Sequence, residues 1–203
     1  MAEPIAFIVD DEPQVARSLK RLLNFHGLEA ETFASAEEFL AREPADRPSC
    51  LVLDVQMPDR DGLDLQRELE RRGRTLQIVF LTGHATVPIG VEAMKGGAVD
   101  FLEKPFEDEQ LVAAVREAIA RDARARRERA ELDELRRRRE ALTPRQRQVF
   151  SLVVRGLPNK QIAARLGNTE KTVKKHRGRV MATMKAGSLA ELVRMAERLG
   201  EGS

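Results

Sequence analysis

The sequence is poor in residues on which several common kinds of site depend. Its 203 residues include one cysteine, Cys50, no tryptophan, no tyrosine and eight phenylalanines. A single cysteine excludes an intramolecular disulfide and a thiolate metal site, which suits a reducing cytosol. The scarcity of aromatic rings argues against base stacking as the main way of binding a ligand.

Long apolar runs and targeting segments are also missing. No stretch of the sequence approaches the ~20 apolar residues that cross a bilayer. Residues 1–9 lack the basic start, the long apolar run and the cleavage site of a signal peptide. We therefore expect a cytoplasmic protein without a membrane partner.

The near-neutral net charge conceals a strong asymmetry along the chain. Residues 1–120 carry 13 Lys and Arg against 23 Asp and Glu, a net charge of −10, whereas residues 121–203 carry 22 against 10, a net charge of +12. Such polarity predicts two domains with different partners. The basic half is the candidate for nucleic-acid binding.

Short apolar runs alternate with helical periodicity in the first half of the chain. The predicted strands lie at residues 5–9, 29–33, 50–53, 78–81 and 99–102. Helical stripes separate and follow them, including one that contains Val91 and Met94. This alternation predicts a five-stranded parallel sheet of the doubly wound, flavodoxin-like α/β class, with helices on both faces.

Residues 121–140 are mostly charged and contain no glycine or proline, which predicts a solvated helical linker with i,i+4 ion pairs. A thin apolar seam leaves a short coiled coil between two protomers as the alternative; it consists of Ala125, Leu132, Leu135 and Leu142. We therefore divide the chain into a domain at 1–120, a linker at 121–140 and a second domain at 141–203.

Helix signals in the second domain predict four short helices. Thr143, Pro144 and Gln146 form a capping box with proline at the first helical position. A helix at 159–166 is closed by Gly167, and Thr169 begins a third helix that continues to about Met184. Ser188 and Glu191 form a second capping box, which opens the fourth helix. The domain is therefore predicted to be all-α.

Polar side chains gather where the predicted strands end. Asp10 and Asp11 follow the first strand and Asp54 the third, while Thr82 and Lys104 follow the fourth and fifth. The carboxyl ends of parallel strands share one edge of the sheet. Clustered carboxylates repel one another and favour a hard cation such as Mg²⁺, and a lysine beside them suits phosphate.

Four motifs at these positions resemble the signatures of the receiver domain of response regulators: IVDDE, LVLDVQMPDRDG, FLTGHA and DFLEKPF. The resemblance covers roughly residues 3–120. It implies that Asp54 accepts a phosphoryl group from a sensor histidine kinase. It also implies a Mg²⁺ held by Asp11, Asp54 and the Gln56 carbonyl, with Asp10 acting through water.

The same resemblance implies roles for three further residues. Lys104 would pair with the phosphoryl group and precede a cis proline, Pro105. Thr82 and Phe101 would form a switch pair that moves toward the added charge. The protein would then be a regulator that accepts phosphate and not an enzyme with turnover.

Helical geometry separates two faces of the predicted third helix of the second domain. At 100° per residue, Val173, Val180 and Met184 face the core. The opposite face is the candidate for the DNA major groove and carries Lys171, Lys174, Lys175 and Gly178. Candidates for phosphate contacts lie at helix starts: Asn159, Lys160, Thr169 and Thr172.

The segments LTPR, NKQIA, TVKKH and SLAELV resemble, in this order, the DNA-binding domain of LuxR-type regulators over residues 141–199. Together with the receiver motifs they point to the NarL/FixJ class and most closely to its FixJ-like branch. Gly178 departs from relatives that place a base-reading residue there. The glycine either permits close backbone approach to DNA or removes one specificity contact.

We also weighed two alternatives to a phosphorylation-controlled transcription factor. A Mg²⁺-dependent phosphatase of the haloacid-dehalogenase type needs a second Asp two residues after its nucleophile, and the sequence has Gln56 there. A DNA-binding protein with a vestigial receiver would not need the complete set of strand-end residues.

The expected partners follow from this assignment. They are a sensor histidine kinase, double-stranded promoter DNA, a second copy of the chain after phosphorylation and RNA polymerase. Movement of the switch pair predicts a dimer surface near the fourth helix, fifth strand and fifth helix of the receiver. Its candidate members are Val91, Lys95, Val112 and Arg116.

Overall fold

The computed structural model describes residues 3–58 and 61–201, and the chain divides into two compact units between Arg126 and Arg127. Residues 59 and 60 of the LVLDVQMPDRDG motif lie outside the described residues. Within the described ranges, no helix combines the length and the apolar character needed to span a membrane.

The first unit alternates strands and helices as the periodicity predicted. Its elements are β1 (Ile5–Val9), α1 (Pro13–Phe25), β2 (Glu29–Phe33), α2 (Ala36–Ala41), β3 (Ser49–Asp54), α3 (Gly62–Arg71), β4 (Gln77–Thr82), α4 (Val87–Lys95), β5 (Asp100–Glu103) and the first part of α5 (Asp108–Glu140). The strands form one parallel sheet in the order β2-β1-β3-β4-β5. The predicted doubly wound fold class is confirmed.

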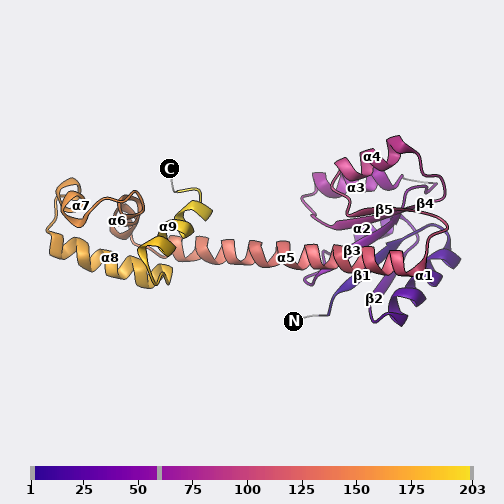
Figure 1. Cartoon of the computed structure of the whole chain (residues 1–203), viewed down its shortest axis with the longest axis horizontal. Helices are drawn as coiled ribbons and strands as arrows, with labels where there is room; N and C mark the ends of the chain where they lie inside the picture. Colours follow the sequence, from indigo (N-terminus) through magenta and orange to yellow (C-terminus); the bar gives the residue numbers. More distant parts are fainter. Residues whose placement is uncertain (1–2, 59–60, 202–203) are drawn as a thin grey trace. The chain divides into compact units, whose positions relative to one another are not determined.

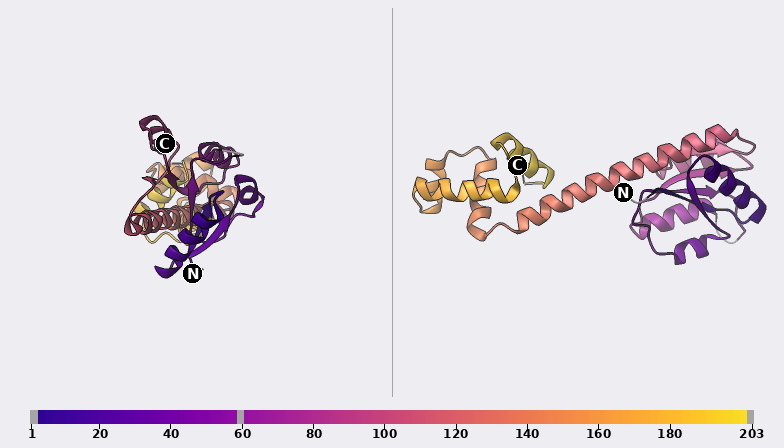
Figure 2. Two further views of the ribbon diagram at one scale, coloured as in Figure 1. Left: turned by 90° about the vertical axis from the view of Figure 1, so that its right-hand side faces the viewer. Right: turned by 90° about the horizontal axis from the view of Figure 1, so that it is seen from below.

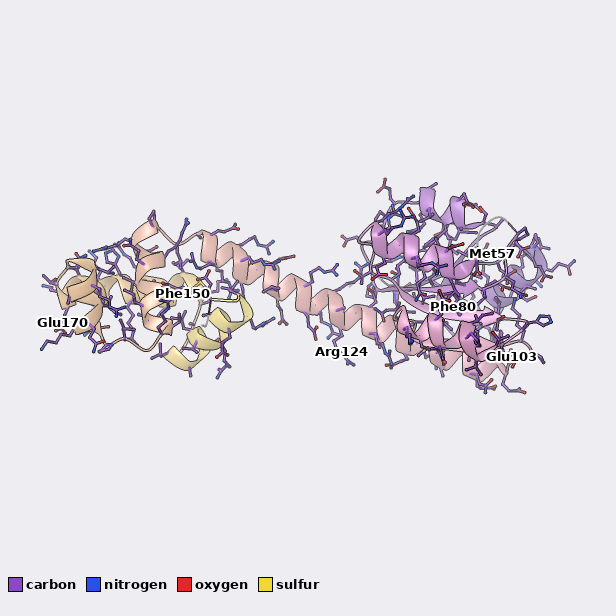
Figure 3. All side chains as sticks on the ribbon, turned by 90° about the horizontal axis from the view of Figure 1, so that it is seen from above. Met57, Phe80, Glu103, Arg124, Phe150 and Glu170 are labelled. Carbon is purple, nitrogen blue, oxygen red and sulfur yellow. The ribbon has the colours of Figure 1, made fainter. Side chains whose placement is uncertain are left out.

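Helices cover both faces of this sheet (Figure 1). Alternate residues of each strand point to opposite faces, so Phe7 and Phe80 pack with α2, α3 and α4, whereas Ile8 and Val79 pack with α1 and α5. Both faces carry buried apolar cores, and Phe80, which Figure 3 labels, is fully buried. Continuous burial explains why the central strands read as unbroken apolar runs.

The register of the central strands brings the predicted site residues to one edge. Val9 pairs with Leu53, and Asp54 pairs with Leu81. The residues that follow β1 and β5 therefore emerge beside Asp54 and Thr82. This is the edge at which open α/β sheets bind their ligands.

The last helix of the first unit and the predicted linker form a single helix, α5. Leu135 and Leu142 of the apolar seam are only 5% and 1% exposed within one chain, while Ala125 is exposed and Leu132 half-buried. This burial disfavours a coiled coil along the seam. The domain bounds at 1–120, 121–140 and 141–203 stay a prediction.

The second unit is all-α, as predicted. After the end of α5 it contains α6 (Pro144–Val154), α7 (Asn159–Leu166), α8 (Glu170–Met184) and α9 (Leu189–Arg198). In the colours of Figure 2 these four run from orange to yellow. They gather around a core that includes Phe150, which Figure 3 labels, Ile162, Val180 and Leu192.

Local capping explains where these helices begin and end. The Thr143 capping box is present in full, and Gly167 closes α7 in the left-handed conformation at φ 60°. The second predicted box is present in part. The Ser188 hydroxyl accepts from the Glu191 N–H, but the Glu191 carboxylate accepts from Gly187 N–H and not from Ser188, because the chain enters α9 through Gly187.

Candidate functional site

The side chains at the carboxyl edge of the sheet form a compact charged group. The Lys104 ammonium nitrogen lies 3.2 Å from Oδ2 of Asp10 and also hydrogen-bonds to Oδ2 of Asp54. Asp10 is 2% exposed and Asp54 6%, so the cation neutralises two carboxylates that have lost most of their water. Three residues distant in sequence thus meet as predicted.

Backbone contacts position Lys104 and the two carboxylates. The Lys104 N–H donates to the Thr82 carbonyl at 2.7 Å, and the Lys104–Pro105 peptide bond is cis, as the resemblance implied. The Glu12 N–H donates to Oδ1 of Asp10 and the Gln56 N–H to Oδ1 of Asp54, each at 2.9 Å. Each carboxylate therefore keeps one oxygen toward Lys104 and one toward its own loop.

Burial and charge shift two pKa values in this group. Burial raises the pKa of Asp10 above its ordinary value, although the Glu12 N–H and the Lys104 ammonium oppose the shift. Burial acts to lower the pKa of Lys104, but the hydrogen bond to Asp54 and the charges of both carboxylates outweigh it and raise that pKa. Lys104 therefore stays charged at neutral pH.

The donor atoms around Asp54 suit a hard divalent cation. Asp10, Asp11 and Asp54 offer carboxylate oxygens and Gln56 a backbone carbonyl, the ligand type that Mg²⁺ prefers. Asp11 and Gln56 line an open cavity of about 380 Å³ together with Asp61. The described residues contain no group of three or more Asp, Glu, His or Cys side chains that are already close enough together to hold a metal ion.

The predicted switch pair lies next to this site. Thr82 is fully buried, and its hydroxyl accepts from the His84 N–H at 3.2 Å. Phe101 is half-buried, with its ring centroid 6.4 Å from that of Phe80. A Cβ at Gly90 would lie 3.7 Å from the Phe101 ring, so the ring contacts α4. Phe101 thus lies between β4, the strand that carries Thr82, and α4, the helix expected to respond to phosphorylation.

Of the four residues predicted for a dimer surface, the structure buries one and leaves three exposed. Val91 and Lys95 are exposed on α4. Val112 is 4% exposed and packs in the core with Leu111, because the apolar stripe of α5 is wide enough to include both positions. The prediction for Val112 was wrong for this chain.

Arg116, the fourth candidate, is exposed but faces α1. Its guanidinium donates to the His26 carbonyl at 3.3 Å. The arginine thus lies on the side of α5 that faces the end of α1. Its membership of the surface predicted for α4, β5 and α5 stays a prediction.

The apolar stripe predicted for α4 also needs correction. Val91 and Met94 are 46% and 50% exposed, and Ala93 is the buried residue of the helix. α4 approaches α3 too closely for a large side chain there, since Gln66 of α3 hydrogen-bonds to the Ala93 carbonyl. Val87, which the sequence analysis did not single out, is 80% exposed. Together, Val87, Val91 and Met94 form an outward apolar face on α4.

The exposed face of α8 matches the face predicted for DNA. Lys171, Lys174 and Lys175 are exposed, while Val173, Val180 and Met184 are buried. Glu170, labelled in Figure 3, begins the helix at the surface of the unit. The Thr169 hydroxyl caps the Thr172 N–H at 3.2 Å and lies 3.0 Å from the Thr172 hydroxyl. One of the two threonine hydroxyls therefore donates its proton to the other, within the chain.

The start of α7 lies beside this face. Lys160 is exposed, and Oδ1 of Asn159 accepts from the Arg177 guanidinium at 3.3 Å. Arg177 was missed because helical geometry placed it on neither of the two faces considered. The sequence signal that could have identified Arg177 is its position on the flank of α8, three residues after Lys174.

Comparison with known proteins agrees with both halves of this picture. A family model described as "Response regulator receiver domain" matches residues 6–116, and one described as "Bacterial regulatory proteins, luxR family" matches residues 140–196. The chain is 49% identical to nodulation protein W of Bradyrhizobium diazoefficiens over 97% of its length and 86% of that protein. It is 45% identical to the transcriptional regulatory protein FixJ of Rhizobium meliloti over 100% and 99%.

Solved structures give the same result. The response regulator StyR superposes with a TM-score of 0.88 at 43% identity, covering 97% of this chain and all of that one. Full-length FixJ from B. japonicum superposes with a TM-score of 0.60 at 39% identity, covering 98% of both chains. The chain therefore belongs to the response regulators that join a receiver domain to a LuxR-type DNA-binding domain, the class of the FixJ transcriptional regulators.

Proposed function

We propose that Asp54 is the residue that accepts a phosphoryl group from the phosphohistidine of a sensor kinase. An Asp54 carboxylate oxygen attacks phosphorus and forms the new O–P bond. The P–N bond to the kinase imidazole breaks, and its electron pair stays on that nitrogen. The observation that supports this assignment is the Lys104 ammonium, hydrogen-bonded to Asp10 and Asp54 at the carboxyl edge of the sheet.

The surrounding residues supply positioning and charge. Control by phosphorylation is standard for this family, which implies a sensor kinase and DNA as partners, and receiver domains bind Mg²⁺ at the phosphorylation site. A Mg²⁺ at Asp10, Asp11, Asp54 and the Gln56 carbonyl would neutralise phosphoryl oxygens. After transfer, Lys104 is close enough to pair with the new phosphoryl group instead of the free carboxylate.

Labelling with the small phosphodonor acetyl phosphate tests the assignment. With Mg²⁺ present, we expect one acid- and alkali-labile phosphoryl group per wild-type chain and none for Asp54→Asn. Asp46→Asn is the matched control, because the Asp46 side chain is exposed on a distant loop. Chelation of Mg²⁺ should stop labelling. Full labelling of Asp54→Asn, with an unchanged circular dichroism spectrum, would show that another residue is the acceptor.

We propose further that α8 binds in the DNA major groove. Its exposed lysines Lys174 and Lys175 would read base edges, with Lys171 beside them. The phosphate contacts would come from the helix starts, namely Asn159, Lys160, Thr169 and Thr172. The proposal is supported by the exposure of all three lysines on one face, opposite a buried apolar face.

Binding measured against salt separates these two roles. Lys174→Ala and Lys175→Ala should weaken binding and blur sequence preference. Lys160→Ala should weaken all sequences alike and reduce the slope of log affinity against log salt by about 1. Arg194→Ala, at an exposed position on α9, is the control. A changed base preference for Lys160→Ala at an unchanged slope would contradict the assignment.

Phosphorylation is proposed to promote a homodimer through the receiver. Movement of Thr82 and Phe101 toward the phosphoryl group would alter α4, whose outward face carries Val87, Val91 and Met94, with Lys95 at its end. Two-fold symmetry then predicts DNA half-sites about one helical turn apart. A shift from monomer to dimer requires only a few kcal/mol.

Sedimentation with and without beryllofluoride tests the dimer. We expect the mass to double on activation at micromolar concentration, and Val91→Glu to prevent it. Phe25→Glu is the matched control, because Phe25 is 86% exposed on α1. An unchanged mass would contradict dimerisation, and an unchanged mass with increased DNA affinity would favour release of a masked DNA-binding domain. A cytoplasmic location and a contact with RNA polymerase belong to the same proposal, on the basis of the family.

A further inference from the structure

Gly178 occupies an unusual position for a glycine. It lies inside α8, four residues after Lys174 and three after Lys175, so it shares their exposed face. Glycine in a helix interior costs about 1 kcal/mol relative to alanine. A glycine at this position calls for a compensating reason.

The described part of the chain offers no internal reason for this glycine. A Cβ added at Gly178 would meet no atom within 4 Å, and its φ is not in the left-handed region. Two other glycines show what an internal reason looks like. A Cβ at Gly62 would lie 2.4 Å from the Asp54 carbonyl oxygen, and one at Gly96 would lie 2.5 Å from the Gln66 side chain. None of the residues 127–201 restricts position 178 in this way.

Loss of a base contact alone does not explain glycine either. An alanine would also leave the position without a polar group, and it would stabilise α8 at the same time. Only a requirement for the absence of a Cβ distinguishes glycine from alanine here. Because no atom of the described residues lies within 4 Å of a Cβ at position 178, that requirement points to a molecule that approaches α8.

We infer that Gly178 is a specificity-determining residue at which the α8 backbone approaches a base edge in the major groove too closely to admit a Cβ. The inference rests on the proposed binding of DNA by α8. With no side chain, the helix presents Cα hydrogens at this point. The apolar group that the major groove offers to such a surface is the C5-methyl of thymine, so Gly178 selects thymine at the base pair beneath it.

Opposite effects on stability and binding test this inference. The probe is a duplex selected by beryllofluoride-activated wild-type protein from a randomised pool. Gly178→Ala should raise the resistance of the full chain to urea yet lower its affinity for this duplex about tenfold, the effect of one mismatched base pair. Gly178→Gln should lower the affinity further. Ala182→Gly, at an exposed position later in α8, measures the effect of helix stability alone.

A second measurement probes the thymine. Replacing each thymine of the selected duplex by uracil removes only the methyl group, and one replacement should weaken wild-type binding while affecting Gly178→Ala less. Unchanged affinity for Gly178→Ala, together with increased stability, would overturn the inference and leave a missing contact as the role of Gly178. Failure of the proposed function itself would be seen separately, as unchanged DNA binding for Lys174→Ala.

Discussion

The side-chain amide of Gln66 on α3 donates a hydrogen bond of 2.9 Å to the carbonyl oxygen of Gly96 at the end of α4. A second bond from the same nitrogen reaches the Ala93 carbonyl at 3.3 Å, and Gln66 is only 7% exposed. The end of a helix has carbonyl groups without helical partners, and Gln66 satisfies them from a neighbouring helix. The contact holds the C-terminal turn of α4 to α3.

Replacing Gln66 by leucine should release this turn. Leu is similar in size but has no donor, so the Gly96 carbonyl would lose its side-chain partner, and we expect a loss of about 1–3 kcal/mol in the free energy of unfolding. Amide hydrogen exchange should be faster at Ala98, whose N–H bonds the Ala93 carbonyl. Gln14→Leu, at an exposed site on α1, is the control. Unchanged exchange at Ala98 would show that the contact contributes little.

A methyl group at Gly62 should disturb the proposed phosphorylation site at Asp54. The Cβ of Gly62→Ala would lie 2.4 Å from the Asp54 carbonyl oxygen and 3.1 Å from the Val55 Cα, so backbone must move. We expect a stability loss of about 1–3 kcal/mol and slower labelling by acetyl phosphate. Gly83→Ala, which meets nothing within 4 Å, should change stability by less than about 1 kcal/mol. Equal stability of the two variants in urea would refute the steric argument.

Among the carboxylates of the described residues, Asp122 should be the most sensitive outside the Asp54 site. Its Oδ2 accepts from the Ser49 N–H at 2.9 Å and from Arg126 at 2.7 Å, and the residue is 4% exposed. Asp122→Ala leaves a buried N–H without an acceptor and Arg126 without its carboxylate, so we expect a loss of about 3 kcal/mol. Asp64→Ala removes an ion pair whose two side chains are both 56% exposed and should cost about 1 kcal/mol or less. Urea unfolding compares the two.

One substitution should stabilise the second unit. Lys185 ends α8 in the left-handed conformation at φ 56°, which glycine adopts without strain. Lys185→Gly is expected to raise the free energy of unfolding by about 1 kcal/mol. Lys185→Ala retains a Cβ and should give no such gain. A higher melting temperature for the alanine variant than for the glycine variant would count against this reasoning.

Much of the charged site around Asp54 could be predicted because one topological rule links distant residues. Once β1, β3, β4 and β5 are read as parallel strands, Asp10, Asp54, Thr82 and Lys104 must emerge at one edge. The α7 boundaries at 159 and 166 were predicted for a different reason, since Gly167 signals a helix end locally. The burial of Val112 was missed because the helical period does not reveal how wide a buried stripe will be.

The sequence by itself determined the order of the elements, the caps of the helices and the edge of the sheet at which charged residues gather. These features follow from the φ/ψ preferences of single residues and from hydrogen bonds between residues close in sequence. They also follow from the periodicity with which side chains repeat along a helix and along a strand. Tertiary structure alone decided that Gln66 meets Gly96, that Asp122 meets Ser49, and that α4 turns Val91 outward around a buried Ala93. Such pairings depend on how closely neighbouring elements approach, and that distance is set by the packing of the whole core.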